Sequence, residues 1–296
     1  MGWVGSSVAI SVLEHGIASE LLVCDARREL AEGEAMDLAH GAAFYPTAQV
    51  RAVELDELES CDAVVIAAGR GGRADESRLA LLRDNAAIVS GIAARLRRLR
   101  GLIVVVTNPV DVMTAVAQEA SGLPAARVIG TGTMLDTARL RQVLGRELGL
   151  EPRSVHAQVV GEHGDSEVVL WSGAHIGGVP LARWPGWSAQ REQELALEVR
   201  SAAYRIIQRK GATNHAIGLV TAALLKWSLR GERRVLTVSR VQDGALGFHD
   251  VALSLPAIVS SLGATEVLEP DMSRAEREAL ERSAEILRRA RASVSS

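Results

Sequence analysis

The sequence predicts an α/β protein, in which a doubly wound parallel sheet is followed by a second unit of α+β type. Two observations lead to this prediction. In the first half of the chain, short apolar runs with the length of buried strands alternate with helical patterns, as in βαβ units. From about residue 134 the alternation stops, and long helices are followed by a pair of strands. We therefore expect two domains, over residues 1–133 and 134–296.

The predicted sheet of the first half is built from short apolar strands. After a helical pattern that ends at Gly16, strands are predicted at residues 21–25, 63–69, 102–107 and 128–130, and helices around residues 77–97 and 111–121. Residues 63–69 form a continuous apolar run and residues 102–107 form another, which is typical of strands buried on both faces. Ligands of such sheets bind beyond the carboxyl ends of the strands, so the glycine- and arginine-rich loop at residues 69–75 is a candidate to cover one.

The chain begins inside a nucleotide-binding motif. Gly2 and Gly5 have the spacing of the second and third glycines of G-x-G-x-x-G, and Asp25 follows about 20 residues later, where an acid binds the ribose. The second glycine lets the backbone approach a pyrophosphate, and the helix N-terminus offers amide donors. The motif predicts a Rossmann-type sheet whose first strand and first glycine are truncated. Because that strand is central in the fold, we expect the natural protein to begin several residues upstream of Met1.

The second half combines long helices with antiparallel strands. Helices are predicted at residues 135–148, 189–208 and 213–229, and strands at residues 154–161, 235–239 and 251–255. Asp243-Gly244 is a turn signal between the last two strands. Ser273 and Glu276 form a capping box at the start of a final amphipathic helix, whose apolar face holds Leu280, Ala284 and Leu287.

The composition excludes several classes of function. The chain has 296 residues and a net charge of −3, which gives no attraction to nucleic acid or to an anionic membrane surface. No apolar run approaches the roughly 20 residues that a membrane span needs, and we expect no secretory signal. Cys24 and Cys61 lie in apolar runs and are predicted to pack in the core, so we expect neither a disulfide nor a metal site. We expect a cytoplasmic protein.

Residues 159–166 carry the clearest indication of chemistry. Two apolar residues end a predicted strand, and His163 follows between two glycines. Imidazole exchanges protons near pH 6.5, and flanking glycines leave the ring open to a small ligand. Asp136 and Arg139 share one face of a predicted helix. Beside His163, the acid would hold its tautomer and stabilise its protonated form, and the arginine could grip a carboxylate with two parallel hydrogen bonds.

Each candidate residue also has a purely structural interpretation. His163 could be a turn residue, and Asp136 and Arg139 could form a surface ion pair. Arg78 could swing a second cation over a ligand, or could be a solvated residue in the first turn of a helix. Asn108 ends a strand at the ligand edge of the sheet, but the proline after it forbids further pairing, so Asn108 could be a strand terminator.

Taken together, the motifs resemble those of the L-lactate/malate dehydrogenase family, and the resemblance covers essentially every residue from Gly2 to Arg289. The segments that carry it are residues 32–38 (EGEAMDL), 107–111 (TNPVD), 135–139 (LDTAR), 161–167 (GEHGDSE) and 210–213 (KGAT). Residues 130–133 (GTGT), taken with residues 161–167, are more similar to bacterial L-lactate dehydrogenases than to malate dehydrogenases.

The resemblance implies roles for the residues of the site. His163 would be the proton donor and acceptor, Asp136 would orient it, and Arg139 would bind the substrate carboxylate. Arg78 would polarise the substrate carbonyl when the loop closes, and Asn108 would position the nicotinamide and the carbonyl. Negative charge that develops on the carbonyl oxygen would thus be stabilised while a hydride reaches the carbon.

The cofactor implied by the resemblance is NAD. Asp25 would hold the adenosine ribose hydroxyls and so favour NAD over NADP, Ile217 would pack on the nicotinamide, and Thr213 would line the substrate pocket. Cofactor contacts are further assigned to Gly2, Val4, Gly69 and Asn108.

The resemblance fails in the loop that sets substrate choice. Where lactate dehydrogenases carry glutamine and malate dehydrogenases arginine, this chain has Gly72, and Ala74 and Asp75 replace the usual Pro-Gly. Because glycine can neither hydrogen-bond through a side chain nor pair with a second carboxylate, we expect weak discrimination between pyruvate and longer 2-oxo acids. The adjacent Arg73 could pair with a second carboxylate in place of the arginine of malate dehydrogenases, so oxaloacetate remains a candidate substrate.

These observations predict an oxidoreductase that transfers a hydride between NAD(H) and a small L-2-hydroxy acid or 2-oxo acid, with L-lactate and pyruvate as the first choice. One alternative within the same class is a dehydrogenase of malate and oxaloacetate, or of a bulkier 2-hydroxy acid. An alternative from another class is a non-catalytic family member, disabled by the truncated nucleotide strand.

A second anion site is expected at Arg141 and His156. Arg141 lies about 200° around the helix from Arg139, and an odd separation on a predicted strand places His156 opposite His163. In resembling bacterial lactate dehydrogenases, the matching residues bind fructose 1,6-bisphosphate across a subunit interface of a tetramer. The resemblance therefore implies a homo-tetramer with this effector. The simpler interpretation is a solvated arginine and a packed strand histidine.

Overall fold

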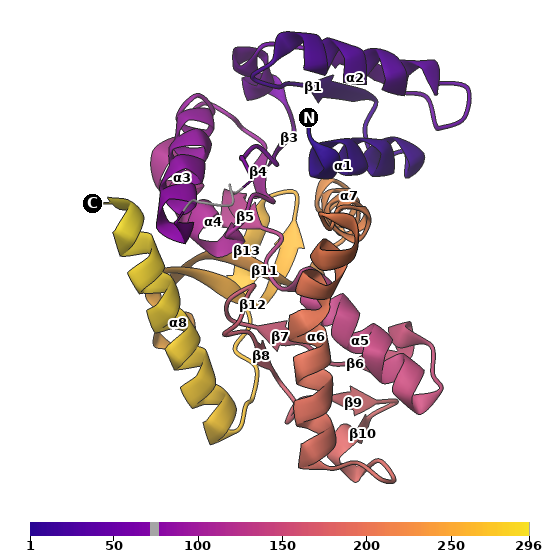
Figure 1. Ribbon diagram of the computed structural model, residues 1–296, viewed down its shortest axis with the longest axis vertical. Coiled ribbons are helices and arrows are strands. Elements are labelled where there is room, and N and C mark those ends of the chain that lie inside the picture. The colour runs from indigo at the N-terminus through magenta and orange to yellow at the C-terminus, as the bar shows by residue number, and fades with distance from the viewer. Residues whose placement is uncertain (72–76, 296) are drawn as a thin grey trace.

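A six-stranded sheet forms the centre of the molecule. The structure, a computed structural model, describes residues 1–71 and 77–295 (Figure 1). The strand order is β13-β12-β11-β5-β4-β3. The first half of the chain supplies three parallel strands, β3 (Ala63–Ile66), β4 (Leu102–Val105) and β5 (Val128–Gly130). The predicted parallel sheet and its βαβ alternation are therefore confirmed for these strands.

The second half of the chain extends this sheet with antiparallel strands. These are β11 (Arg234–Asp243), β12 (His249–Ser260) and β13 (Gly263–Val267). The two halves join where Ser239 of β11 pairs with Gly130 of β5. A Cβ on Gly130 would collide with the Thr114 hydroxyl, so only glycine fits at this junction.

Strands β1 (Glu20–Val23) and β2 (Gln49–Ala52) form a separate parallel pair. Within the described residues, no strand pairs with the second edge of β1 or with the second edge of β3. The sheet is thus interrupted between β1 and β3, which agrees with the prediction of a Rossmann-type sheet that lacks its first strand. Helix α2 (Arg28–His40), which the sequence analysis did not predict, packs on this strand pair through Ala31, Ala35 and Leu38.

Two layers of helices cover the six-stranded sheet. Alternate residues of β4 face opposite cores: Ile103 and Val105 belong to an apolar cluster that includes residues of α4 and α8, whereas Val104 belongs to one that includes residues of α1 and α7. This alternation of apolar residues on both faces is why the strand sequence is apolar throughout. Figure 1 shows α3, α4 and α8 on one side of the sheet and α1 and α7 on the other. The helices are α1 (Trp3–Glu14), α3 (Arg78–Ala94), α4 (Val110–Ser121), α7 (His215–Leu229) and α8 (Arg274–Ser295).

The remaining helices and strands of the second half form a smaller layer. Helices α5 (Met134–Leu148) and α6 (Ala189–Lys210) pack together. The prediction of one strand over residues 154–161 is wrong, because β6 (Val155–His156) pairs with β9 (His175–Ile176) whereas β7 (Val159–Val160) pairs with β8 (Val168–Val169). Strand β10 (Val179–Pro180) completes the β6–β9 sheet. Short 3₁₀ helices occur at Leu55–Ser60, Ala125–Arg127, Pro152–Ser154, Leu181–Arg183 and Ala245–Gly247.

The predicted start of the last helix is confirmed. The Ser273 hydroxyl accepts a hydrogen bond from the main-chain N–H of Glu276 (3.3 Å), and the Glu276 carboxylate accepts one from the main-chain N–H of Ser273 (2.6 Å). Leu280, Ala284 and Leu287 are buried, as the amphipathic pattern predicted. No helix in the described part of the chain is long and apolar enough to cross a membrane.

Cys24 and Cys61 are half-buried and unpaired, and both pack against the core. Burial raises the pKa of each thiol. Their predicted role as core residues is confirmed.

Candidate active site

A histidine, an aspartate and an arginine are hydrogen-bonded to one another at the junction of the two halves. His163 lies in the loop after β7, and its Nδ1 is 2.5 Å from Oδ2 of Asp136. The second carboxylate oxygen of Asp136 accepts a hydrogen bond from Nη1 of Arg139 (2.7 Å). Asp136 and Arg139 lie one turn apart on α5, so the predicted juxtaposition is confirmed.

Burial makes the charges of this trio strongly interdependent. The Asp136 side chain is 3% exposed, that of Arg139 is 13% exposed and that of His163 is 22% exposed. Burial would lower the pKa of His163, but the charge and hydrogen bond of Asp136 and the charge of Asp111 raise it to about 9. Burial would raise the pKa of Asp136, but His163 and Arg139 together hold it below its ordinary value. A carboxylate beside a protonated imidazole is therefore the stable arrangement near neutral pH.

Nδ1 is committed to Asp136, so Nε2 is the ring nitrogen that can exchange a proton with a ligand. Arg139 has five N–H groups, one of which donates to Asp136. The remaining donors allow a planar anion such as a carboxylate to bind beside the ring. The trio can thus bind a small acid and transfer a proton to it.

Two further buried carboxyl groups lie close to His163, and the sequence analysis did not assign them a role. Asp111 accepts a hydrogen bond from the main-chain N–H of His163 (2.8 Å). Glu167 is buried, and burial together with the charge of Asp136 raises its pKa to about 8, although Arg200, His163 and Arg139 act in the opposite direction. Both residues belong to segments that carried the resemblance, and that membership is the one signal that could have indicated them.

The residues predicted to hold a dinucleotide lie around the start of α1. Gly2 is the N-cap of α1 and makes no side-chain cap, and a Cβ there would meet nothing within 4 Å. The space beside Gly2 at the start of α1 is therefore open, as close approach of a pyrophosphate to the backbone requires. Asp25 follows β1, and its carboxylate binds the amino group of Met1 and accepts a hydrogen bond from the main-chain N–H of Arg27 (2.9 Å). An acid beside this helix N-terminus fits a ribose–pyrophosphate group.

The carboxyl ends of β3 and β4 hold the next two predicted residues. Gly69 follows β3, and a Cβ there would lie 3.0 Å from Cγ2 of Thr107, so the two chain segments approach closely. Asn108 follows β4, is exposed, and precedes a cis peptide bond to Pro109. Both residues therefore lie at the sheet edge where ligands of this fold bind.

The remaining predicted site residues lie on α1, on α7 and in the connection before α7. Val4 of α1 and Ile217 of α7 pack against one apolar cluster. Thr213 is half-buried in the connection between α6 and α7. A Cβ on Gly218 would lie 2.6 Å from the carbonyl oxygen of Ser7, so glycine allows α7 to approach the first helix.

The structure gives little information on the predicted residues Gly72 and Arg78. Gly72 lies outside the described residues, as do Arg73, Ala74 and Asp75. Arg78 is the first residue of α3, and the structure describes its backbone but not its side chain.

Arg141 and His156 lie on adjacent elements, α5 and β6. Nε of Arg141 donates to the carbonyl oxygen of Ala157 (3.1 Å), next to His156. The His156 ring is exposed and stacks on His175 of the neighbouring strand, with ring centroids 4.9 Å apart. The premise that His156 and His163 share one strand is wrong, since β6 and β7 belong to different sheets. In the described ranges, no three side chains of the histidine, cysteine or carboxylate type gather as a metal site requires.

A Rossmann-type sheet with an open helix N-terminus and a paired His–Asp at its ligand edge defines a nicotinamide-dependent dehydrogenase. Family models bear this out. Residues 1–130 match the lactate/malate dehydrogenase NAD binding domain, and residues 133–295 match the lactate/malate dehydrogenase alpha/beta C-terminal domain. The chain belongs to the lactate/malate dehydrogenase family, as its motifs predicted.

Individual relatives agree over nearly the full length. The L-lactate dehydrogenase of Salinibacter ruber is 44% identical over 300 residues, which covers 99% of this chain and 95% of the relative. That of Thermus aquaticus is 43% identical over 294 residues, covering 97% and 95%. The crystal structure of a minor L-lactate dehydrogenase from Enterococcus mundtii, in a ligands-bound form, is 36% identical with a TM-score of 0.96 and covers 99% of this chain and 96% of that one.

Proposed function

We propose that this protein catalyses the reversible, NAD-linked reduction of pyruvate to L-lactate. The observation that carries the proposal is the buried Asp136 carboxylate, which binds His163 at 2.5 Å and Arg139 at 2.7 Å. A proton donor and a carboxylate-binding cation are thereby held side by side, and a 2-oxo acid needs both. The names of the relatives in Salinibacter ruber and Thermus aquaticus support lactate as the substrate.

In the proposed reaction, bound NADH supplies the hydride that reduces the carbonyl carbon. Arg139 holds the substrate carboxylate with the N–H groups that Asp136 does not use. His163 donates its Nε2 proton to the carbonyl oxygen, and Asp136 stabilises the imidazolium until that proton leaves. In the reverse direction the neutral ring accepts the hydroxyl proton.

The other residues of the site act on position and charge in this proposal. Arg78 stabilises the negative charge that develops on the carbonyl oxygen. Asn108 positions the carbonyl, and Thr213 lines the substrate pocket. NAD is held by Gly2, Val4, Asp25, Gly69, Asn108 and Ile217. The proposal also divides the chain into two domains, with the boundary between residues 133 and 134. The ends of the two family matches support that boundary.

One assay tests the proposed function. NADH oxidation with pyruvate should be rapid, and His163→Asn should retain NADH binding while losing about 10²–10⁴ in rate, the typical contribution of a general acid. Turnover of His163→Asn at the wild-type rate would contradict the proposal. A protein that binds NADH without oxidising it in the presence of any 2-oxo acid would be the non-catalytic alternative.

Gly72 leaves malate and bulkier 2-hydroxy acids as the second candidate substrates. A panel of 2-oxo acids assayed with NADH ranks them directly. Gly72→Gln should sharpen the preference for pyruvate, and Gly72→Arg should favour oxaloacetate. Unchanged ratios of kcat/KM in both variants would mean that this position does not contact the substrate.

We further propose that the protein is a homo-tetramer and that fructose 1,6-bisphosphate binds at Arg141 and His156. The proximity of Arg141 to the carbonyl of Ala157, and so to the His156 segment, supports a shared anion site. The effector should increase pyruvate reduction at sub-saturating substrate, and Arg141→Gln should remove the increase. Identical curves with and without effector would exclude this regulation, and light scattering would measure the oligomeric state.

A further inference from the structure

The loop that carries His163 is anchored from three elements at once. Gly161, which has a φ of 83°, exchanges two 2.9 Å main-chain hydrogen bonds with Ser254 of β12. The main-chain N–H of Glu162 donates to the Ser283 hydroxyl of α8 (2.9 Å), and that of His163 donates to the Asp111 carboxylate of α4 (2.8 Å). Three successive residues are therefore held, and Asp111 is the anchor that can carry charge.

We propose that Asp111 is a positioning residue for the proton donor: its buried carboxylate fixes the main chain of His163 and, when ionised, stabilises the imidazolium. This inference rests on the proposed role of His163. Asp111 is 2% exposed, and its Oδ2 binds the His163 amide. His163 thus lies between two carboxylates, one on its ring nitrogen and one on its main chain. The inferred role of Asp111 is separate from that of Asp136, because Asp111 binds the main-chain N–H of His163 whereas Asp136 binds the ring nitrogen.

The surroundings of Asp111 allow its charge to change near neutral pH. Its Oδ1 has no hydrogen-bond partner. Burial raises the pKa of Asp111 to about 6, although the hydrogen bond from the His163 amide and the charge of His163 act to lower it. A carboxyl that ionises in this range can alter the charge beside His163 within the working range of an enzyme.

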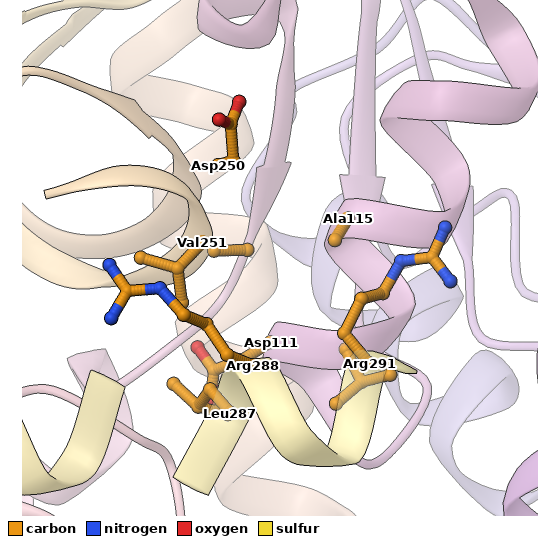
Figure 2. A pocket seen from close by; sticks show the side chains of 9 residues that line it. Asp111, Ala115, Asp250, Val251, Leu287, Arg288 and Arg291 are labelled. Carbon is orange, nitrogen blue, oxygen red and sulfur yellow. The ribbon is translucent and has the colours of Figure 1, made fainter. Parts of the chain in front are cut away.

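A small pocket between α4, β12 and α8 reaches Asp111 (Figure 2). Asp250 of β12 and Arg288 and Arg291 of α8 line it, and in Figure 2 the two guanidinium groups point away from each other. The titratable and charged groups around Asp111 therefore come from two places. His163 and Glu162 belong to the loop that carries His163, and Asp250, Arg288 and Arg291 line the pocket. The matched control is Asp250, an exposed acid of the same pocket.

Asp111→Asn separates the charge from the hydrogen bond, because the amide oxygen still accepts from His163. We expect the alkaline limb of kcat/KM for pyruvate reduction to move down by about one pH unit, the size of effect that a nearby charge produces. NADH affinity should stay unchanged, and Asp250→Asn should match the wild type. Asp111→Ala should show the same shift together with a lower kcat, because the loop loses an anchor. A limb that stays in place in Asp111→Asn would overturn the proposal.

A measurement on the wild-type protein keeps the proposal testable if the variants do not fold. The ¹H and ¹⁵N shifts of the His163 amide should titrate with a midpoint near the Asp111 pKa of about 6, since this N–H donates to the titrating group. A His163 amide that does not respond to pH in that range would refute the role of Asp111. This readout needs no turnover, so failure of the lactate assay would contradict the proposed function and leave the Asp111 result intact.

Discussion

Replacing Asp136 by asparagine removes one charge from the site and leaves the shape of the side chain nearly unchanged. In the native site Asp136 accepts hydrogen bonds from both His163 (2.5 Å) and Arg139 (2.7 Å). Burial lowers the pKa of His163, but Asp136, with a contribution from Asp111, raises it to about 9. Without the carboxylate we expect the pKa of His163 to return to its ordinary 6.5 or to fall lower.

The size of the effect follows from this change in pKa. A fall of about 2.5 pH units corresponds to about 3.4 kcal/mol less stabilisation of the imidazolium. At pH 8, about nine-tenths of the native protein would carry a protonated His163, against about 3% of the variant. The kcat/KM for pyruvate reduction should therefore fall about thirtyfold at pH 8, and the deficit should shrink as the pH approaches 6.

The assay follows NADH absorbance across pH 5–10 in both directions. Lactate oxidation needs the neutral ring, so at pH 8 it should suffer less than pyruvate reduction. NADH binding, measured by fluorescence, should not change. Equal losses in both directions at every pH, or an alkaline limb that remains near pH 9, would refute the assignment of Asp136 as the group that holds the proton on His163.

Three other substitutions, one of them with a matched control, have defined outcomes. Arg139→Lys should chiefly raise KM for pyruvate, because a point charge replaces a planar fork; a fall in kcat at constant KM would contradict this. Burial raises the pKa of Asp111 from 3.8 to about 6 in the folded protein, so protonated Asp111 favours folding and ionised Asp111 opposes it. This stabilisation is fully present below pH 3.8 and is lost as the pH rises through 6. The contribution to the free energy of unfolding is about 3 kcal/mol in all, and about half of it should be lost between pH 5 and 8. Urea unfolding of the wild type and of Asp111→Asn measures this loss, and parallel pH profiles of the two proteins would contradict the prediction. Gly218→Ala should destabilise the fold by about 1–3 kcal/mol, because its Cβ would lie 2.6 Å from the Ser7 carbonyl oxygen. Gly91→Ala, where nothing lies within 4 Å, should be neutral or stabilising in the same thermal melt.

The parts of the fold that the sequence predicted are those with strong patterns. Strand β4 is apolar throughout because its alternate residues pack against two different cores, and such a run is visible without the structure. Strand β2 was missed because it has four residues with alternating exposure and only a short pattern. Residues 154–161 were predicted as one strand because their β propensity is continuous, whereas the break between β6 and β7 depends on their partners.

The site was predictable where its chemistry lies in side chains and not where it lies in the main chain. His163, Asp136 and Arg139 have recognisable residue types and spacing, and the structure joins them. The hydrogen bond from His163 to Asp111 involves a main-chain N–H and spans 52 positions. No side-chain pattern marks such a contact, because every residue other than proline offers the same donor.

The position of His163 relative to the sheet depends on buried hydrogen bonds between the two halves of the chain. Thr133, just after β5, donates its hydroxyl to the carbonyl of Val159 in β7 (2.6 Å), and its main-chain N–H donates to the Ser254 hydroxyl (3.1 Å). Ser254 in turn pairs with Gly161, two residues before His163. Thr133 and Ser254 are fully buried, so water does not compete for these bonds. The carboxyl end of β5 is thereby linked to the His163 loop through Thr133 and Ser254. Because Thr133 belongs to the first half of the chain and Ser254 to the second, neither half alone could fix the position of His163 relative to the sheet.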